Sequence, residues 1–224
     1  MSNLKKNGFK IINLDKKKLE KLKSQKKSLF KDIYKIKKDL SLSDLPKYYL
    51  DQKKKHYWDK FYNLSNKQSL VYSILLDKKI LNELKKYGYK NPGILPENCG
   101  LRFDFPNIEK TRFMPHQDSP YNTGGINNVT VWIPLMTTDE RLGSLRIYSN
   151  FKKKIIKHRL QNKKLICDNY VKNTTFTEKF IKLGKGIFMN QCLIHSSGKN
   201  RANIPRITIL GRYFDFYDLK FKYK

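Results

Sequence analysis

Histidine is scarce in this chain of 224 residues, and two of its four histidines lie in sequence patterns that could bind a metal ion. His116 is separated from Asp118 by a single residue. Side chains alternate along an extended segment, so the imidazole and the carboxylate would point to the same side. Such a pair supplies two ligands of a metal site. Taken alone, His116 is more typical of a half-buried histidine and Asp118 of a turn cap.

A third candidate ligand, His195, ends an apolar stretch and is followed by a turn-rich loop. Two histidines and one carboxylate on a β scaffold form the ligand set that holds non-haem iron(II) and leaves coordination positions open. Arg206 begins the next apolar stretch, where it could bind the far carboxylate of a dicarboxylate cosubstrate through its planar fork. Arg201 is an alternative anchor, but it lies in the polar loop, so Arg206 is favoured.

The elements that must position these residues change in character near residue 92. Residues 1–14 suggest an irregular leader or an edge strand. Residues 16–40 carry apolar side chains at near-helical spacing and predict a lysine-covered amphipathic helix. A second, continuous helix is predicted to start at Ser65 or Asn66 and to end near Gly88.

After residue 92, short apolar or alternating runs between turn residues predict antiparallel strands. The expected strands are Leu101–Phe105, Phe113–Gln117, Val129–Leu135, Ser144–Ser149, Lys164–Ile166, Thr175–Ile181, Gly186–Met189, Cys192–Ser196 and Arg206–Phe216. Helices followed by strands favour an α+β fold, mainly β, in which a sandwich or barrel carries an N-terminal helical layer. We therefore expect a helical extension, residues 1–91, packed on a β-rich core, residues 92–224, as one structural unit.

The net charge of +29 at pH 7 suggests a nucleic-acid or other anionic partner. Lysine supplies 40 of the 48 basic residues, whereas readers of base edges and phosphates rely on the fork of arginine. We therefore expect a solvated lysine surface and no specific nucleic-acid partner. Steering of an anionic substrate, or weak contact with an anionic surface, stays open as an alternative.

Neither membrane insertion nor a disulfide framework is expected. No window approaches the ~20 apolar residues of a transmembrane helix, and the first ten residues lack the apolar region of a secretory signal. The cysteines are odd in number and widely spaced, at Cys99, Cys167 and Cys192. The expected location is the cytoplasm.

Four linked stretches between Leu101 and Phe216 together resemble the phytanoyl-CoA dioxygenase family of 2-oxoglutarate-dependent oxygenases. They are Pro115–Asp118, Asn128–Leu135, Gly143–Arg146 and His195–Arg206. The resemblance implies a double-stranded β-helix, the jelly-roll or cupin-like form of the barrel. It also implies iron(II) bound by His116, Asp118 and His195, 2-oxoglutarate held by Arg206, and a cosubstrate pocket lined by Ser197 and Trp132. Trp132 is equally typical of a core residue.

The implied reaction is hydroxylation of a small molecule, such as a sugar or another metabolite. It consumes O2 and decarboxylates 2-oxoglutarate to succinate and CO2. Tyr121, in the loop after the first two ligands, is a candidate for the substrate pocket. Three other functions stay open: a non-catalytic jelly-roll binding module, a basic nucleic-acid-binding protein, and another cupin-like metal enzyme such as an isomerase.

Overall fold

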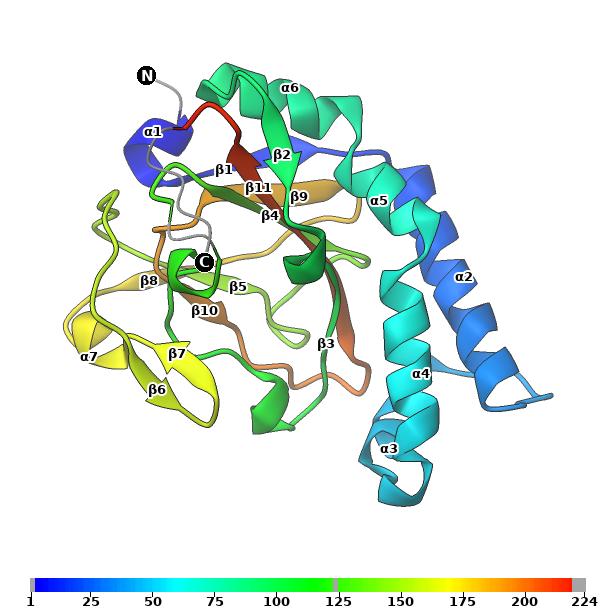
Figure 1. Cartoon of the computed structure of the whole chain (residues 1–224). Coiled ribbons are helices and arrows are strands. Elements are labelled where there is room, and N and C mark those ends of the chain that lie inside the picture. Colours follow the sequence, from blue (N-terminus) through cyan, green and yellow to red (C-terminus); the bar gives the residue numbers. More distant parts are fainter. Residues whose placement is uncertain (1–2, 123–124, 219–224) are drawn as a thin grey trace.

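The computed structural model describes residues 3–122 and 125–218 (Figure 1). The helices are α1 (Asn3–Asn7), α2 (Lys16–Ile33), α3 (Leu45–Leu50), α4 (Lys55–Asn66), α5 (Ser69–Leu75), α6 (Lys78–Tyr87) and α7 (Asp168–Val171). The strands are β1 (Phe9–Asn13), β2 (Pro92–Ile94), β3 (Gly100–Asp104), β4 (Val129–Pro134), β5 (Leu145–Tyr148), β6 (Arg159–Gln161), β7 (Lys164–Ile166), β8 (Phe176–Lys179), β9 (Lys185–Asn190), β10 (His195–Ser197) and β11 (Arg206–Asp215).

These strands form two main antiparallel sheets and one small hairpin. The larger sheet has the order β1-β9-β4-β11-β2, and β3 also pairs with β11. The smaller sheet has the order β10-β5-β8, while β6 pairs with β7. The long strand β11 pairs with β2, β3 and β4 along its length. It therefore provides a rigid support for any side chain that it carries.

The larger sheet separates two hydrophobic clusters, because successive side chains of a strand point to opposite faces. In β4, Val131 and Ile133 pack in the cluster that contains the apolar residues of the helices. Trp132, between them, packs instead with Leu145 and Ile147 of the smaller sheet. The helices thus cover the outer face of the larger sheet, and the smaller sheet faces its inner side (Figure 1).

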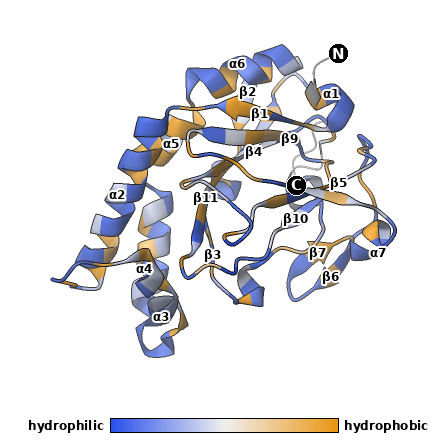
Figure 2. Cartoon of the chain, turned by 180° about the vertical axis from the view of Figure 1, so that it is seen from behind, coloured by the Kyte–Doolittle hydropathy of each residue, from blue (hydrophilic) through white to orange (hydrophobic). Residues whose placement is uncertain are grey.

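The N-terminal helices are amphipathic, as the spacing predicts. Helix α2 buries Leu19, Leu22 and Phe30, and hydrophilic residues line much of its length (Figure 2). Strand β1 lies at the edge of the larger sheet beside β9, which agrees with an edge strand in residues 1–14. Because β1 and the helices share a hydrophobic cluster with β4, we propose that residues 1–91 and the core fold as one unit. Within the described ranges, no helix is both long enough and apolar enough to cross a membrane.

Both predicted helices are shorter than the sequence suggests. The first ends at Ile33, and Lys35 follows in the left-handed region with φ 52°. The second is wrong as one continuous helix, because the backbone is extended at Asp77 between α5 and α6. The Asp77 carboxylate accepts a hydrogen bond from Lys79 N and so starts a new helix. The predicted end at Gly88 is confirmed, since Gly88 is left-handed with φ 117°.

One predicted strand is absent from the described structure. Residues 113–117 form no strand, and only an isolated bridge joins His116 to His195. The strand expected from Cys192 begins at His195 instead, because Asn190 Oδ1 accepts a hydrogen bond from Cys192 N in a turn. The other expected strands are present, with shifts of a few residues at their ends.

The break at Asp77 generates a stability prediction. Asp77→Ala removes the cap of α6 and the ion pair of Asp77 with Lys18 Nζ at 3.0 Å, and should lower the free energy of unfolding by about 1 kcal/mol. Asp77→Asn keeps an accepting oxygen for the cap and should lose much less, because partly exposed ion pairs contribute little. Urea unfolding of the three proteins measures this difference. Equal losses in the two variants would contradict the capping role.

Candidate active site

The three predicted ligands converge at one buried place. His116 Nε2 lies 3.8 Å from Asp118 Oδ1, and His195 Nε2 lies 3.9 Å from Asp118 Oδ2. The centres of the two imidazole rings are 4.3 Å apart. One ligand atom from each residue lies within 4.8 Å of the other two, which is a spacing that a single metal ion could bridge.

The protonation of the two histidines suits a cation between them. Nδ1 of His116 donates a hydrogen bond to Met114 O at 2.7 Å, and Nδ1 of His195 donates one to Leu193 O at 3.0 Å. A carbonyl oxygen only accepts, so Nδ1 carries a hydrogen in each ring, and in the neutral form Nε2 exposes an electron pair. Burial lowers the pKa of His116 to about 3. The atoms that face one another are therefore all acceptors, and a divalent cation fits them.

Asp118 lies between the histidines and Arg212, whose Nη2 is 3.4 Å from Asp118 Oδ1. Burial by itself raises the pKa of Asp118. The charge of Arg212 is the largest influence in the opposite direction, and the pKa of Asp118 lies well below its usual value. Asp118 is therefore ionised at neutral pH, as an anionic metal ligand must be.

A backbone bridge, and not a strand, brings the ligand segments together. The N–H of His116 donates to His195 O and the N–H of His195 donates to His116 O, each at 3.0 Å. Gln117 fixes the segment between the first two ligands. Its Nε2 donates to the carbonyls of Cys192 and Lys154, and its Oε1 accepts from Ile156 N. These bonds leave His116 and Asp118 free to face His195.

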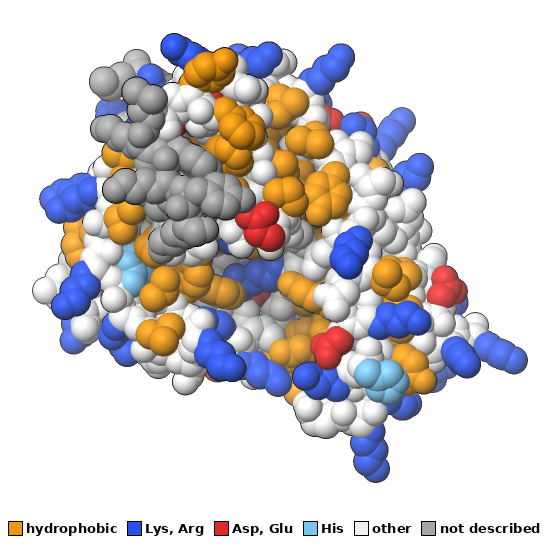
Figure 3. Space-filling view, in the orientation of Figure 1, with side chains coloured by type: hydrophobic (Ala, Val, Ile, Leu, Met, Phe, Trp, Pro, Cys, Tyr) orange, Lys and Arg blue, Asp and Glu red, His pale blue; other side chains and the backbone are white. Residues whose placement is uncertain are grey.

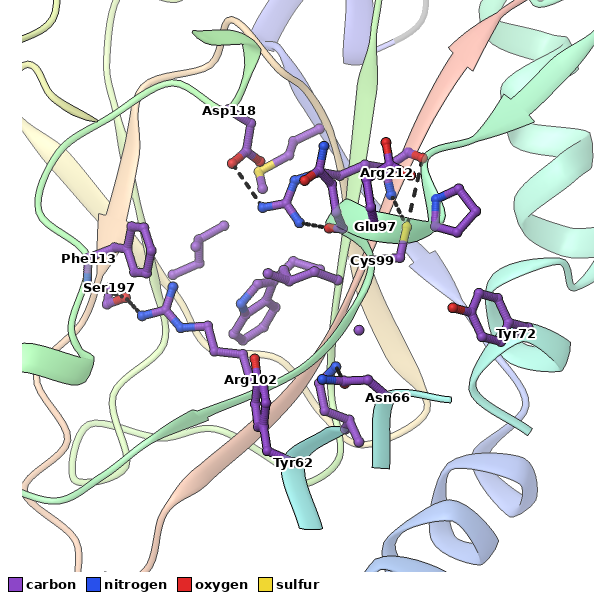
Figure 4. A pocket seen from close by; sticks show the side chains of 18 of the residues that line it. Tyr62, Asn66, Tyr72, Glu97, Cys99, Arg102, Phe113, Asp118, Ser197 and Arg212 are labelled. Atoms are coloured by element: carbon purple, nitrogen blue, oxygen red, sulfur yellow. Dashed lines mark hydrogen bonds and ion pairs between the residues drawn. The ribbon is translucent and has the colours of Figure 1, made fainter. Parts of the chain in front are cut away.

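The ligands line a cavity of about 610 Å³ (Figure 4). Its inner wall comes from strands of both sheets, and its outer part comes from α4, α5 and the loop before β3. Besides the three ligands, it is lined by Tyr62, Asn63, Asn66, Lys67, Tyr72, Pro96, Glu97, Asn98, Cys99, Gly100, Leu101, Arg102, Phe113, Trp132, Leu145, Met189, Ser197, Leu210 and Arg212. The wall thus includes two arginines, which lie on different sides in Figure 4: Arg212 beside Asp118, and Arg102 beside Ser197.

Arg102 belongs to a buried cluster of charges. Its Nη2 lies 2.5 Å from Asp104 Oδ1, and Arg206 Nη2 lies 2.8 Å from Asp104 Oδ2. Two guanidinium groups share one carboxylate, so the cluster keeps one formal positive charge. Burial lowers the pKa of Arg102, which indicates that its charged form is poorly solvated. The Nε atoms of Arg102 and Arg206 have no hydrogen-bond partner among the described residues. An anion in the cavity at Arg102 would stabilise this poorly solvated charge.

The helical layer helps to place Arg102. Asn66, at the end of α4, accepts a hydrogen bond from Leu101 N through its Oδ1 at 2.6 Å. Gly100 has φ +145°, and a Cβ there would lie 2.6 Å from Asn66 Oδ1. Only glycine at this position lets the backbone approach Asn66 so closely without displacing the Asn66 side chain. The start of β3 is therefore held against α4, two residues before Arg102.

Of the predicted cosubstrate residues, Trp132 and Ser197 line the cavity, and Ser197 Oγ accepts hydrogen bonds from Arg102 and from Phe113 N. Arg206 lies behind Arg102 and is 1% exposed, and it is not among the described residues that line the cavity. Arg201 is exposed and does not line it either.

Tyr121, the predicted substrate residue, packs beside the ligands. Its ring meets the His116 ring edge-on at 5.8 Å, and its hydroxyl forms hydrogen bonds with the backbone N and O of Leu165. It is not one of the described cavity-lining residues. Its contacts indicate support of His116, and a role toward substrate stays a prediction.

The sequence interpretation missed Arg102, Asp104 and Arg212. A signal for each was present. Arg102 and Asp104 are two residues apart on a predicted strand, so they share one face of it. Arg212 is an even number of residues after Arg206 on β11 and shares its face in the same way. Charged residues that repeat on one face of an otherwise apolar strand indicate a buried polar site.

Several solved structures resemble this chain over 95% of its length. They include the non-heme monooxygenase ThoJ in its apo form (14% identity, 76% of that chain, TM-score 0.65). Another is the epimerase SnoN in complex with Fe3+, alpha ketoglutarate and nogalamycin RO (13%, 81%, 0.59). A third is EctD from S. alaskensis with 2-oxoglutarate and 5-hydroxyectoine (13%, 73%, 0.59). No protein-family model matches the sequence, and no curated protein matches it.

At such low identity the likeness concerns the fold. It confirms the predicted α+β class with a jelly-roll core and an N-terminal helical layer. Membership of the phytanoyl-CoA dioxygenase family is not confirmed, because no family model matches.

The buried state of His116 predicts a pH dependence of stability. Its pKa is about 3 in the folded protein and near 6.5 in an unfolded chain, so the unfolded chain binds more protons between these values. The free energy of unfolding of the metal-free protein should therefore fall as the pH drops from about 6.5 towards 3. Urea unfolding at several pH values in this window measures the slope. His116→Gln should reduce it, and an unchanged slope would contradict the buried neutral imidazole.

Proposed function

We propose that this protein is an iron(II)- and 2-oxoglutarate-dependent oxygenase of the phytanoyl-CoA dioxygenase family that hydroxylates a small molecule. The observation that carries the proposal is the set of His116, Asp118 and His195, whose facing atoms are all acceptors. Two histidines and one carboxylate with open positions are typical of non-haem iron(II) oxygenases. The positive cluster at Arg102 in the same cavity supports a dicarboxylate cosubstrate.

In this proposal His116, Asp118 and His195 hold iron(II). The bound iron, with 2-oxoglutarate and O2, supplies the oxidising power, and 2-oxoglutarate leaves as succinate and CO2 while the substrate gains a hydroxyl group. The backbone carbonyls at Nδ1 keep the two imidazoles oriented toward the ion. Arg212 keeps Asp118 ionised.

The far carboxylate of 2-oxoglutarate is held at the cluster of Arg102, Asp104 and Arg206. Arg206 is the anchor that the sequence predicts, and we extend the anchor to Arg102. Arg102 faces the cavity and would contact the carboxylate, with Ser197 beside it. Arg206 would supply positive charge from behind and would keep Asp104 in place. Both contributions strengthen in a buried site, where charges are poorly screened.

Apolar residues of the cavity wall would exclude water from the reacting groups. They include Trp132, Leu145, Met189 and Leu210, and Phe113 lies under the Arg102 guanidinium at 4.1 Å. A water-poor site protects a reactive oxidant from side reactions and strengthens each charged contact.

The high net charge carries no separate function in this proposal. Lysine and arginine side chains are scattered along much of the outline of the face drawn in Figure 3 and are not gathered into one stripe. This distribution supports a solvated coat in a cytoplasmic enzyme, with no specific nucleic-acid partner. The coat would also attract small anions from solution.

The cosubstrate anchor can be tested by succinate production against 2-oxoglutarate concentration. Losing one partner of a buried charge pair costs about 3–5 kcal/mol, so Arg102→Ala and Arg206→Ala should raise the half-saturating 2-oxoglutarate concentration by roughly two to three orders of magnitude. Arg102→Lys and Arg206→Lys should recover part of this loss, because they keep the charge without the planar fork.

Arg201→Ala is the matched control, because Arg201 is exposed and lies outside the cavity. Uncoupled turnover suffices for the assay while the substrate is unknown. A large loss in Arg201→Ala, with none at Arg102 or Arg206, would move the anchor to the loop. No loss in any variant would argue against 2-oxoglutarate itself.

A further inference from the structure

We propose that Arg212 binds an anionic group of the substrate, a carboxylate or a phosphate, next to the metal ligands. This inference rests on the proposed function, and it narrows the substrate to small anionic molecules. It also assigns the two cavity arginines to different ligands. Arg102 serves the cosubstrate, and Arg212 serves the substrate.

The position of Arg212 is the first argument. It extends from β11 into the cavity, beside Asp118 and away from Ser197, which marks the Arg102 side (Figure 4). Its Nη1 donates to Asn98 O, and its Nη2 makes a long contact of 3.4 Å with Asp118 Oδ1. Its Nε is buried and has no hydrogen-bond partner among the described residues. The two contacts use one N–H of Nη1 and one of Nη2, so each of these atoms keeps a second N–H for an anion in the cavity.

The balance of formal charges is the second argument. Arg102, Arg206 and Arg212 carry three positive charges, while Asp104 and Asp118 carry two negative ones. Iron(II) adds two positive charges, and 2-oxoglutarate removes two. One positive charge therefore remains in the loaded cavity.

That charge belongs to Arg212. In the loaded site Asp104 is shared by Arg102 and Arg206, while Asp118 is a metal ligand. Lys67 and Glu97 at the mouth are both exposed and opposite in charge, so they do not change the balance. A largely buried cation without a counterion is costly, and an anionic substrate would supply the counterion.

Metal binding should also make Arg212 more available to bind an anion. In the absence of a metal, Asp118 is the nearest carboxylate to Arg212. When Asp118 binds a metal, its electron pairs are committed to the ion, and its attraction to Arg212 weakens. Binding of the metal and binding of the anion should therefore reinforce each other, and this coupling is reciprocal.

A purely structural role is the main alternative. In that case Arg212 only orients Asp118 and holds the Asn98 carbonyl. Its replacement would then change the affinity for the metal. It would not change the preference of the cavity for anions over neutral molecules, and this preference is the readout that separates the two roles.

The test is calorimetry on protein loaded with Ni(II), which does not support turnover, and with saturating 2-oxoglutarate to fill the Arg102 side. The probes are benzoate, phenyl phosphate and the neutral benzamide. We expect at least one anion to bind about 10- to 100-fold more tightly than benzamide. Arg212→Gln should abolish this preference, and Arg212→Lys should keep part of it.

Arg146→Gln is the matched control, because Arg146 is a half-buried, ion-paired arginine outside the cavity. It should keep the anion preference. The proposal is overturned if the wild-type protein shows no preference for anions. It is also overturned if Arg212→Gln keeps the preference, which direct binding of the probe to nickel would produce, or if Arg212→Gln changes only the affinity for nickel.

Separate titrations with Ni(II) and 2-oxoglutarate distinguish this proposal from the proposed function. If neither binds, the oxygenase assignment fails. The same probes on the metal-free protein then still test Arg212, with weaker but Arg212-dependent binding expected. Equal binding of benzoate, phenyl phosphate and benzamide there would overturn the anion site independently.

Discussion

The carboxylate of Asp118 is 3% exposed and lies between two imidazoles and a guanidinium. Taking such a group out of water costs several kcal/mol unless its partners offset the cost. Arg212, whose Nη2 lies 3.4 Å from Asp118 Oδ1, offsets part of this cost, and a divalent cation between Asp118 and the two Nε2 atoms would offset much more. These groups are held together by the backbone bridge between His116 and His195 and by the hydrogen bonds of the Gln117 side chain.

Strand β11 connects the centre at Asp118 and Arg212 with the charge cluster of Arg102, Asp104 and Arg206. It carries Arg206 near its start and Arg212 further along the same face, and it is paired with neighbouring strands throughout. The spacing between the two positive centres is thus set by the backbone of one strand. Two anions in the cavity, one at each centre, would be held at a fixed separation. Binding on rigid strands is what a reaction that requires precise placement needs.

The helical layer contributes to the site as well as to the core. Asn66 at the end of α4 holds the start of β3, and α4 and α5 supply Tyr62 and Tyr72 to the outer part of the cavity. The shape of the cavity mouth therefore depends on the part of the chain in which the sequence shows no motif. This arrangement explains how one scaffold could serve different substrates through changes in its N-terminal segment.

Local patterns predicted much of this structure. Short apolar or alternating runs located β3, β4 and β11, and the combination of His116, Asp118 and His195 was visible from residue types and spacing. The break at Asp77 was missed because a single aspartate between apolar residues also occurs on the polar face of an unbroken amphipathic helix.

The missing strand at residues 113–117 has a different cause. The segment is held by side-chain and bridge contacts from distant residues, which no local pattern reveals. The sharing of Asp104 by Arg102 and Arg206 is likewise a tertiary contact, so the sequence indicated a single arginine where the structure has a cluster.

The most direct test of the central claim is an anaerobic titration of the protein with iron(II) and 2-oxoglutarate, followed by the weak visible charge-transfer band of the iron chelate. The band should appear only when both are present, should saturate in proportion to bound iron, and should be lost in His195→Ala. A protein that binds iron but shows no band with 2-oxoglutarate would rule out the proposed site, and so would a full band in His195→Ala.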